Sequence, residues 1–197
     1  MSARLALTII QAEHQALSVL LRALPQLLVE QRQQGCGLDF ELLRSALFYL
    51  DEFPDRLHHA KESELLFPKL RARAPHLRGT LDRLDHEHLL GSRSVRDLEF
   101  ALLGVEMLGE TRRQPFEKAL QRFVHGYMAH MKLEEAEILP AAIALLSDED
   151  WNDLDEAFAA NKDPLTGAEP SAIYQPLFER ILDRLPPPPP RPRSSTD

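Results

Sequence analysis

The sequence predicts an all-α protein, organised as an antiparallel up-down four-helix bundle with short C-terminal helices and a disordered Pro-rich tail. Between about residues 4 and 146, apolar residues recur at intervals of three and four, the pattern of amphipathic helices. No stretch shows the alternation of a half-buried strand. The connections between the helical stretches are short, which favours antiparallel neighbours.

The bundle is expected to take most of the chain. The 197 residues suit one domain with short appendages, and the 44% hydrophobic and 27% charged residues are typical of a globular protein. We therefore expect a bundle at 1–146, a helical appendage at 147–185 and the Pro-rich tail at 186–197.

The first two helices have clear boundaries. The first is predicted from about residue 5 to the turn that contains Gly35, and Pro25 is a candidate for a kink within it. Asp39 is a plausible N-cap for the second helix. Pro54 is expected to kink that helix, which ends near Pro68 or Pro75.

The remaining helices follow in order along the chain. The third is predicted over about 80–108, and the fourth begins near Thr111 and includes Ile138. Ser147 and the acidic residues after it predict the start of a short helix that packs across one end of the bundle. A last short helix is expected over about 171–185.

Charge and composition exclude several classes of function. The net charge of -8 argues against binding a nucleic-acid backbone, which needs clustered Lys and Arg. No apolar run reaches the length of about 18 residues that a membrane helix needs, and the N-terminus lacks a signal-like apolar region, so a cytoplasmic location is expected. Cys36 is the single cysteine, so a metal site has to use His, Asp and Glu.

A short internal repeat points to a metal centre. His58 and Glu62 lie four residues apart in HHAKESELLFP, and the spacing recurs 72 residues later at His130 and Glu134 in HMKLEEAEILP. Each glutamate is followed six residues later by proline. Residues four apart share one helix face, so two such helices can place two metals in the bundle core, bridged by carboxylates. Iron suits this mixed set of nitrogen and oxygen ligands, which contains no thiolate.

The first and third helices are expected to add further imidazoles. His14 lies on the same side of its helix as Leu17, Leu21 and neighbouring leucines, so it points into the core. The third helix offers His86 and His88, which lie on opposite faces. The 72-residue offset maps His14 onto His86, but the apolar positions share the face of His88. We therefore prefer His88 and keep His86 as the alternative.

Several further residues are candidates for secondary roles. His59 is an alternative to His58, because it is three residues from Glu62. Tyr127 is expected to hydrogen-bond near the site. The others are predicted to lie on the surface, in a loop or beside the ligands: Glu64, His76, His125 and Glu135.

With these residues assembled, the chain resembles the bacterial hemerythrin-like family, the HHE cation-binding domains. The similarity covers most of residues 5–146 and rests on EHQAL, LHHAKESELLFPKL, EHLLG and HMKLEEAEILP. It implies two non-haem irons joined by an oxo or hydroxo bridge. The ligands that it implies are His14, His58, Glu62, His88, His130 and Glu134. It also supports His88, because the family's third-helix histidine is commonly followed three residues later by glycine, here Gly91.

One departure from the family's oxygen carriers bears on function. Those proteins have a histidine pair four apart on the third helix, whereas Leu84 and Ser92 flank His88 at that spacing. The resemblance therefore implies sensing of O2, NO or peroxide, iron handling or a stress response, rather than oxygen carriage. The alternatives are a di-iron oxidoreductase acting on peroxide or NO, and a regulatory bundle with a structural metal that docks an unidentified protein partner. No catalytic motif favours an enzyme.

Overall fold

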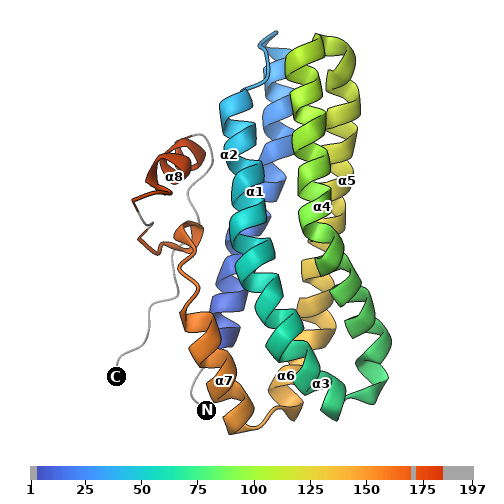
Figure 1. Ribbon diagram of the computed structural model, residues 1–197, viewed down its shortest axis with the longest axis vertical. Helices are drawn as coiled ribbons and strands as arrows, with labels where there is room; N and C mark the ends of the chain where they lie inside the picture. The colour runs from blue at the N-terminus through green and yellow to red at the C-terminus, as the bar shows by residue number, and fades with distance from the viewer. Residues whose placement is uncertain (1–3, 170–171, 184–197) are drawn as a thin grey trace.

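The computed structural model describes residues 4–169 and 172–183. Within them every regular element is helical, which confirms the all-α prediction, and four long helical segments stand side by side (Figure 1). The predicted tail at 186–197 lies outside the described residues. No helix in the described ranges is both long and apolar enough to cross a membrane.

Two of the four segments are single helices, α1 (Leu5–Gln33) and α4 (Arg78–Leu108). The other two are compound. The α2–α3 segment contains α2 (Phe40–Leu50), π-helical stretches at Asp51–His59 and Glu62–Leu66, and α3 (Phe67–Arg73). The α5–α6 segment contains α5 (Arg113–Leu133), a π-helical stretch at Glu134–Ile138 and α6 (Leu139–Leu145). Short 3-10 turns at Pro75–Leu77 and Gly109–Arg112 precede α4 and α5.

The prolines shape these segments in different ways. Pro25 lies inside α1 without ending it, whereas Pro54 lies in a π-helical stretch. Pro68 and Pro140 each lie two residues after the end of the π-helical stretch that begins at a repeated glutamate. Proline has no N–H to donate and its ring crowds the carbonyl four residues before it, so a wider turn relieves the conflict. The matched prolines thus give matched wide turns at the two candidate ligands.

Two apolar cores lie one above the other along the bundle. Leu20, Tyr49 and Phe116 belong to one core, and Phe67 and Trp151 belong to the other. Each large buried side chain contributes about 1.5–3 kcal/mol to stability. On all four segments, the residues between the two cores are the candidate metal ligands. The cores therefore hold a polar layer between them.

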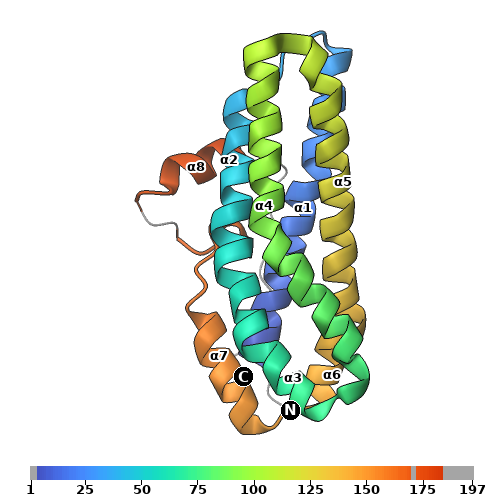
Figure 2. The same cartoon turned by 45° about the vertical axis from the view of Figure 1, so that its right-hand side comes forward.

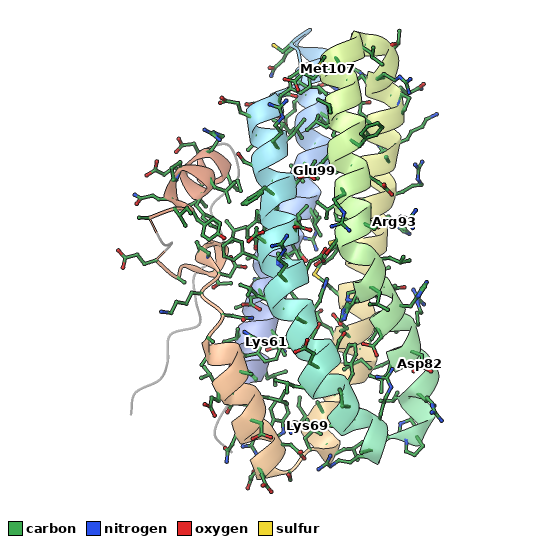
Figure 3. The ribbon with its side chains drawn as sticks, viewed as in Figure 1. Lys61, Lys69, Asp82, Arg93, Glu99 and Met107 are labelled. Atoms are coloured by element: carbon green, nitrogen blue, oxygen red, sulfur yellow. The ribbon has the colours of Figure 1, made fainter. Side chains whose placement is uncertain are left out.

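The short C-terminal helices are confirmed. α7 (Asp148–Ala159) begins with a capping box in which Ser147 and Asp150 bond each other's backbone N–H, as its sequence predicts. It was expected across one end of the bundle, but it packs along α1, because Trp151 and other apolar residues join the core there (Figure 1). Lys69, labelled in Figure 3, lies on the side that faces α7 and pairs with Asp153 at 2.8 Å.

After α7, the chain makes a 3-10 turn at Pro164–Thr166 and then forms α8 (Gln175–Leu182) beside α2. Asp163 anchors this turn. Its carboxylate accepts hydrogen bonds from the Tyr49 hydroxyl at 2.7 Å and from the Leu165 backbone N–H at 2.9 Å. Burial raises the pKa of Asp163 from 3.8 to about 6.

A pH-dependent stability follows from Asp163. A raised carboxyl pKa stabilises the fold below the unfolded value of 3.8, and this contribution is lost as pH rises through about 6. Asp163→Asn removes the ionisation. Relative to the unaltered protein, the variant is expected to gain about 3 kcal/mol in free energy of unfolding between about pH 4 and about pH 7. Urea unfolding at several pH values measures this, and parallel curves for the two proteins would contradict it.

Candidate metal centre

The polar layer between the cores brings together side chains from all four segments. α1 supplies one imidazole, α4 another, and the two compound segments supply the remaining imidazoles and both carboxylates. All seven side chains are at most 8% exposed. They are His14, His58, His59, Glu62, His88, His130 and Glu134.

The Glu62 carboxylate lies between two sets of histidines. Its Oε1 is 3.2 Å from Nε2 of His58, and its Oε2 is 3.6 Å from Nε2 of His88. One carboxylate therefore presents one oxygen to each side of the centre.

Glu134 repeats this arrangement from the opposite side. Its Oε2 is 3.5 Å from Nε2 of His14, and its Oε1 is 3.2 Å from Nε2 of His130. Two donor positions result. We call the one beside His14 and His58 the first position, and the one beside His88 and His130 the second position.

These donors fit metal ions. Ligand atoms about 2.1 Å from one ion and at right angles to each other lie about 3 Å apart, close to the separations found here. All four carboxylate oxygens of Glu62 and Glu134 are buried without a hydrogen-bond partner in the described structure. Buried carboxylate oxygens are rarely left unpaired, because desolvation of the charge is costly. Bound cations would satisfy them.

The outer nitrogens of the histidines next to the first position are held by carboxylates. Nδ1 of His58 lies 2.6 Å from Oε2 of Glu13, and Nδ1 of His14 lies 3.1 Å from Oε1 of Glu135. A carboxylate at Nδ1 fixes the proton there and leaves Nε2 free as a ligand.

The histidines of the second position are held in the same way. Nδ1 of His130 lies 2.9 Å from Oε2 of Glu87, and Nδ1 of His88 lies 2.8 Å from Oγ of Ser63. The sequence analysis did not identify Glu13, Ser63 and Glu87. A signal was present, because Glu13 and Glu87 each directly precede a candidate histidine.

The contacts around the centre follow an internal symmetry. Positions in the α2–α3 segment recur 72 residues later in the α5–α6 segment, so Ser63 corresponds to Glu135. His14 corresponds to His88 at 74 residues, however, because 44 residues separate His14 from His58 and only 42 separate His88 from His130. This difference explains why the 72-residue offset pointed to His86.

The other candidates lie away from the centre. His86 is exposed on α4, whereas the ring of His88 stacks on Phe67 with 5.4 Å between centroids. The side chains of His76, His125 and Glu64 are exposed.

His59 was considered as an alternative to His58, but the structure buries both. His58 faces His14, whereas His59 faces the α4 and α5 side. Nε2 of His59 is 2.9 Å from the Tyr127 hydroxyl, and its Nδ1 is 3.0 Å from Oδ1 of Asp55. The expectation that Tyr127 hydrogen-bonds near the site is therefore met through His59.

His59 differs from the other histidines in its orientation. Single donor atoms of His59, Glu62, His88 and His130 lie within 4.8 Å of one another, a spacing that suits one ion. The His59 ring, however, stacks on His88 with centroids 4.1 Å apart and an interplanar angle of 12°. An imidazole ligand uses a lone pair in its ring plane, and two stacked parallel rings do not point at the same ion. Because of this ring orientation, His59 lies beside the ligands and is not one of them.

Electrostatics in the protein without metal show how strongly the layer favours positive charge. Burial opposes the ionisation of Glu62, but the neighbouring positive charge of His58 holds the pKa of Glu62 well below its usual range. Burial likewise opposes the protonation of His130, yet Glu134 and Glu87 raise the pKa of His130 to about 9. Burial and the neighbouring His88 lower the pKa of His59 well below its usual range. Metal ions would replace the protons on the ligands.

Comparison with known proteins agrees with this geometry. A family model described as the hemerythrin HHE cation binding domain matches residues 5–142. The match includes all four segments of the bundle that reach the centre and indicates metal binding. Neither the comparison with curated proteins nor that with solved structures gave a match.

Proposed function

Because the chain belongs to the hemerythrin HHE cation-binding family, we propose that it holds two non-haem irons joined by an oxo or hydroxo bridge. The observation that supports two ions is the pair of buried carboxylates, Glu62 and Glu134, each with one oxygen toward each position. A single ion would leave half of these oxygens unpaired.

The proposed ligand set is symmetric. His14 and His58 would hold the iron at the first position, and His88 and His130 would hold the iron at the second. The two glutamates would bridge both irons. Six protein donors shared in this way leave coordination positions open for a small ligand.

Two irons in this setting would supply redox-active positions able to bind O2, NO or peroxide. The protein's own residues fix and protect them. Outer partners such as Glu13 and Glu87 hold the imidazole rings in orientation, and the two apolar cores exclude water above and below the layer. We therefore propose a role in sensing these small molecules, in iron handling or in the response to oxidative and nitrosative stress.

Metal analysis of protein isolated with ample iron tests the proposal. We expect about two irons per chain and the absorption bands of an oxo-bridged ferric pair. His130→Ala should lower the iron content, whereas His76→Ala, in an exposed 3-10 turn, should leave it unchanged. Protein that stays free of iron after reconstitution would refute the proposed function.

A further inference from the structure

The symmetry of the centre fails at two places beside the ligands. At the 72-residue offset, His59 corresponds to Met131, and Asp55 corresponds to Tyr127. Both His59 and Tyr127 are buried and bond each other at 2.9 Å. One side of the centre therefore carries a polar pair that has no counterpart on the other side.

Access to the two positions is also unequal. The cavity next to the first position is lined by His14 and His58 and also by His59 and Tyr127. It has a volume of about 10 Å³, which suits a single water molecule. A groove between α4 and α5 has a volume of about 640 Å³ and reaches His59, Tyr127 and His130. This is the size of a site for a small organic molecule. α4 and α5 stand side by side in Figure 2, with α1 behind them.

The walls of the groove carry both apolar side chains and charged ones, the latter including Arg83, Glu87 and Arg122, and its floor is polar. Its apolar lining residues are Leu90, Leu98, Ala119, Phe123 and Ala129. Phe123 also packs against the Tyr127 ring at 5.6 Å, which extends the apolar surface toward the floor. At the floor are the Tyr127 hydroxyl, the His59 imidazole and the second metal position. A molecule that matches both parts has an apolar body and an oxygen-bearing anionic head.

We infer that the groove between α4 and α5 binds a small organic oxyanion, of the size and chemistry of an aromatic carboxylate, with its head toward His59, Tyr127 and the second position. This inference rests on the proposed function, because the charge of the second ion attracts the head. The pair lines both the cavity and the groove, so the larger space beside the second position determines where the molecule binds. A centre that handled only diatomic molecules would not require a groove of this volume.

Gly126 offers a direct test, because it lines the groove on α5 and a Cβ added there meets nothing within 4 Å. Gly126→Leu places an apolar side chain in the groove, starting from a Cβ that meets no neighbour. Gly104→Leu is the matched control, since its Cβ also meets nothing within 4 Å and Gly104 does not line the groove. Both changes also replace glycine within a helix, so their effects on helix stability are similar.

The probes are benzoate and formate, titrated into the iron-loaded protein and followed by its absorption spectrum. Benzoate is expected to bind more tightly than formate. Gly126→Leu should weaken benzoate about tenfold, because the added side chain occupies the space of the ring, and should leave formate nearly unchanged. Gly104→Leu should change neither. Equal affinities for the two anions, or benzoate affinity unaffected by Gly126→Leu, would overturn the inference.

His59→Met tests the polar pair by giving the position its symmetry counterpart. The variant should keep both irons and bind each anion about fivefold more weakly, because a hydrogen-bonding group at the floor is lost. Loss of one iron instead would show that His59 is a metal ligand. It would refute the inference that His59 binds the head of the anion in the groove.

Iron measured in the same samples separates the two proposals. If the protein holds two irons but Gly126→Leu does not change its affinity for benzoate, only the inference about the groove is refuted. Chains without iron overturn the proposed function and, with it, the inference that depends on it.

Discussion

Glu62→Ala is expected to remove both ions from the protein, with at least about a 100-fold loss of affinity at each position, because even partners of ligands contribute about 10- to 100-fold. Its Oε1 faces His58 at the first position, and its Oε2 faces His88 at the second. His14→Ala, by contrast, removes a donor from the first position only. The ratio of iron to chain after buffer exchange, together with titration of metal into the stripped protein, measures the difference.

Glu64→Ala is the matched control for this substitution. Glu64 lies two residues further along the same wide turn, and its side chain is exposed. It should bind metal as the unaltered protein does. A Glu62→Ala protein that kept two irons would show that the carboxylate does not bridge the positions.

Removing the metal is expected to lower the midpoint of thermal unfolding by about 8–16 °C. Ions that bind only the folded chain stabilise it by about 4 kcal/mol when their concentration is about 1,000 times the dissociation constant. In a protein of this size each kcal/mol shifts the midpoint by about 2–4 °C. The physical origin is the set of buried carboxylate oxygens of Glu62 and Glu134, which have no hydrogen-bond partner in the described structure. Calorimetry with and without a chelator measures the shift.

The Glu62→Ala variant provides the control for that experiment. Because it is expected to lack both ions, a chelator should leave its unfolding midpoint where it was. If the chelator shifted the unfolding midpoint of the variant and of the unaltered protein equally, the effect would not come from this centre. If it shifted neither, the layer would not hold metal that matters for stability.

Much of the architecture could be predicted from the sequence because it depends on local spacing. Apolar residues at intervals of three and four set the helical segments, and Ser147 with its acidic neighbours set the start of α7. The repeated His58 and Glu62 pattern placed two donors on one helix face, since residues four apart always share a face. The choice of His88 over His86 used the same argument from helix periodicity, and the structure brings His88 to the centre.

The tertiary structure alone decided which side chains meet across helices. Glu13 holds His58 and Glu87 holds His130, and no spacing along the chain connects either pair. His59 was weighed only as an alternative to His58, because neighbours on a regular helix point about 100° apart. In a bundle, two such directions both lead inward, one toward α1 and the other toward α4 and α5.

The sequence by itself therefore determined the helices, the repeated donors and the family. Only the packing of the four segments decided that His59 bonds Tyr127, that α7 lies along α1 and that a groove opens between α4 and α5. The physical reason is that a helix fixes the direction of each side chain through its period. What that side chain meets depends on the distance and rotation of a neighbouring helix far away in the chain.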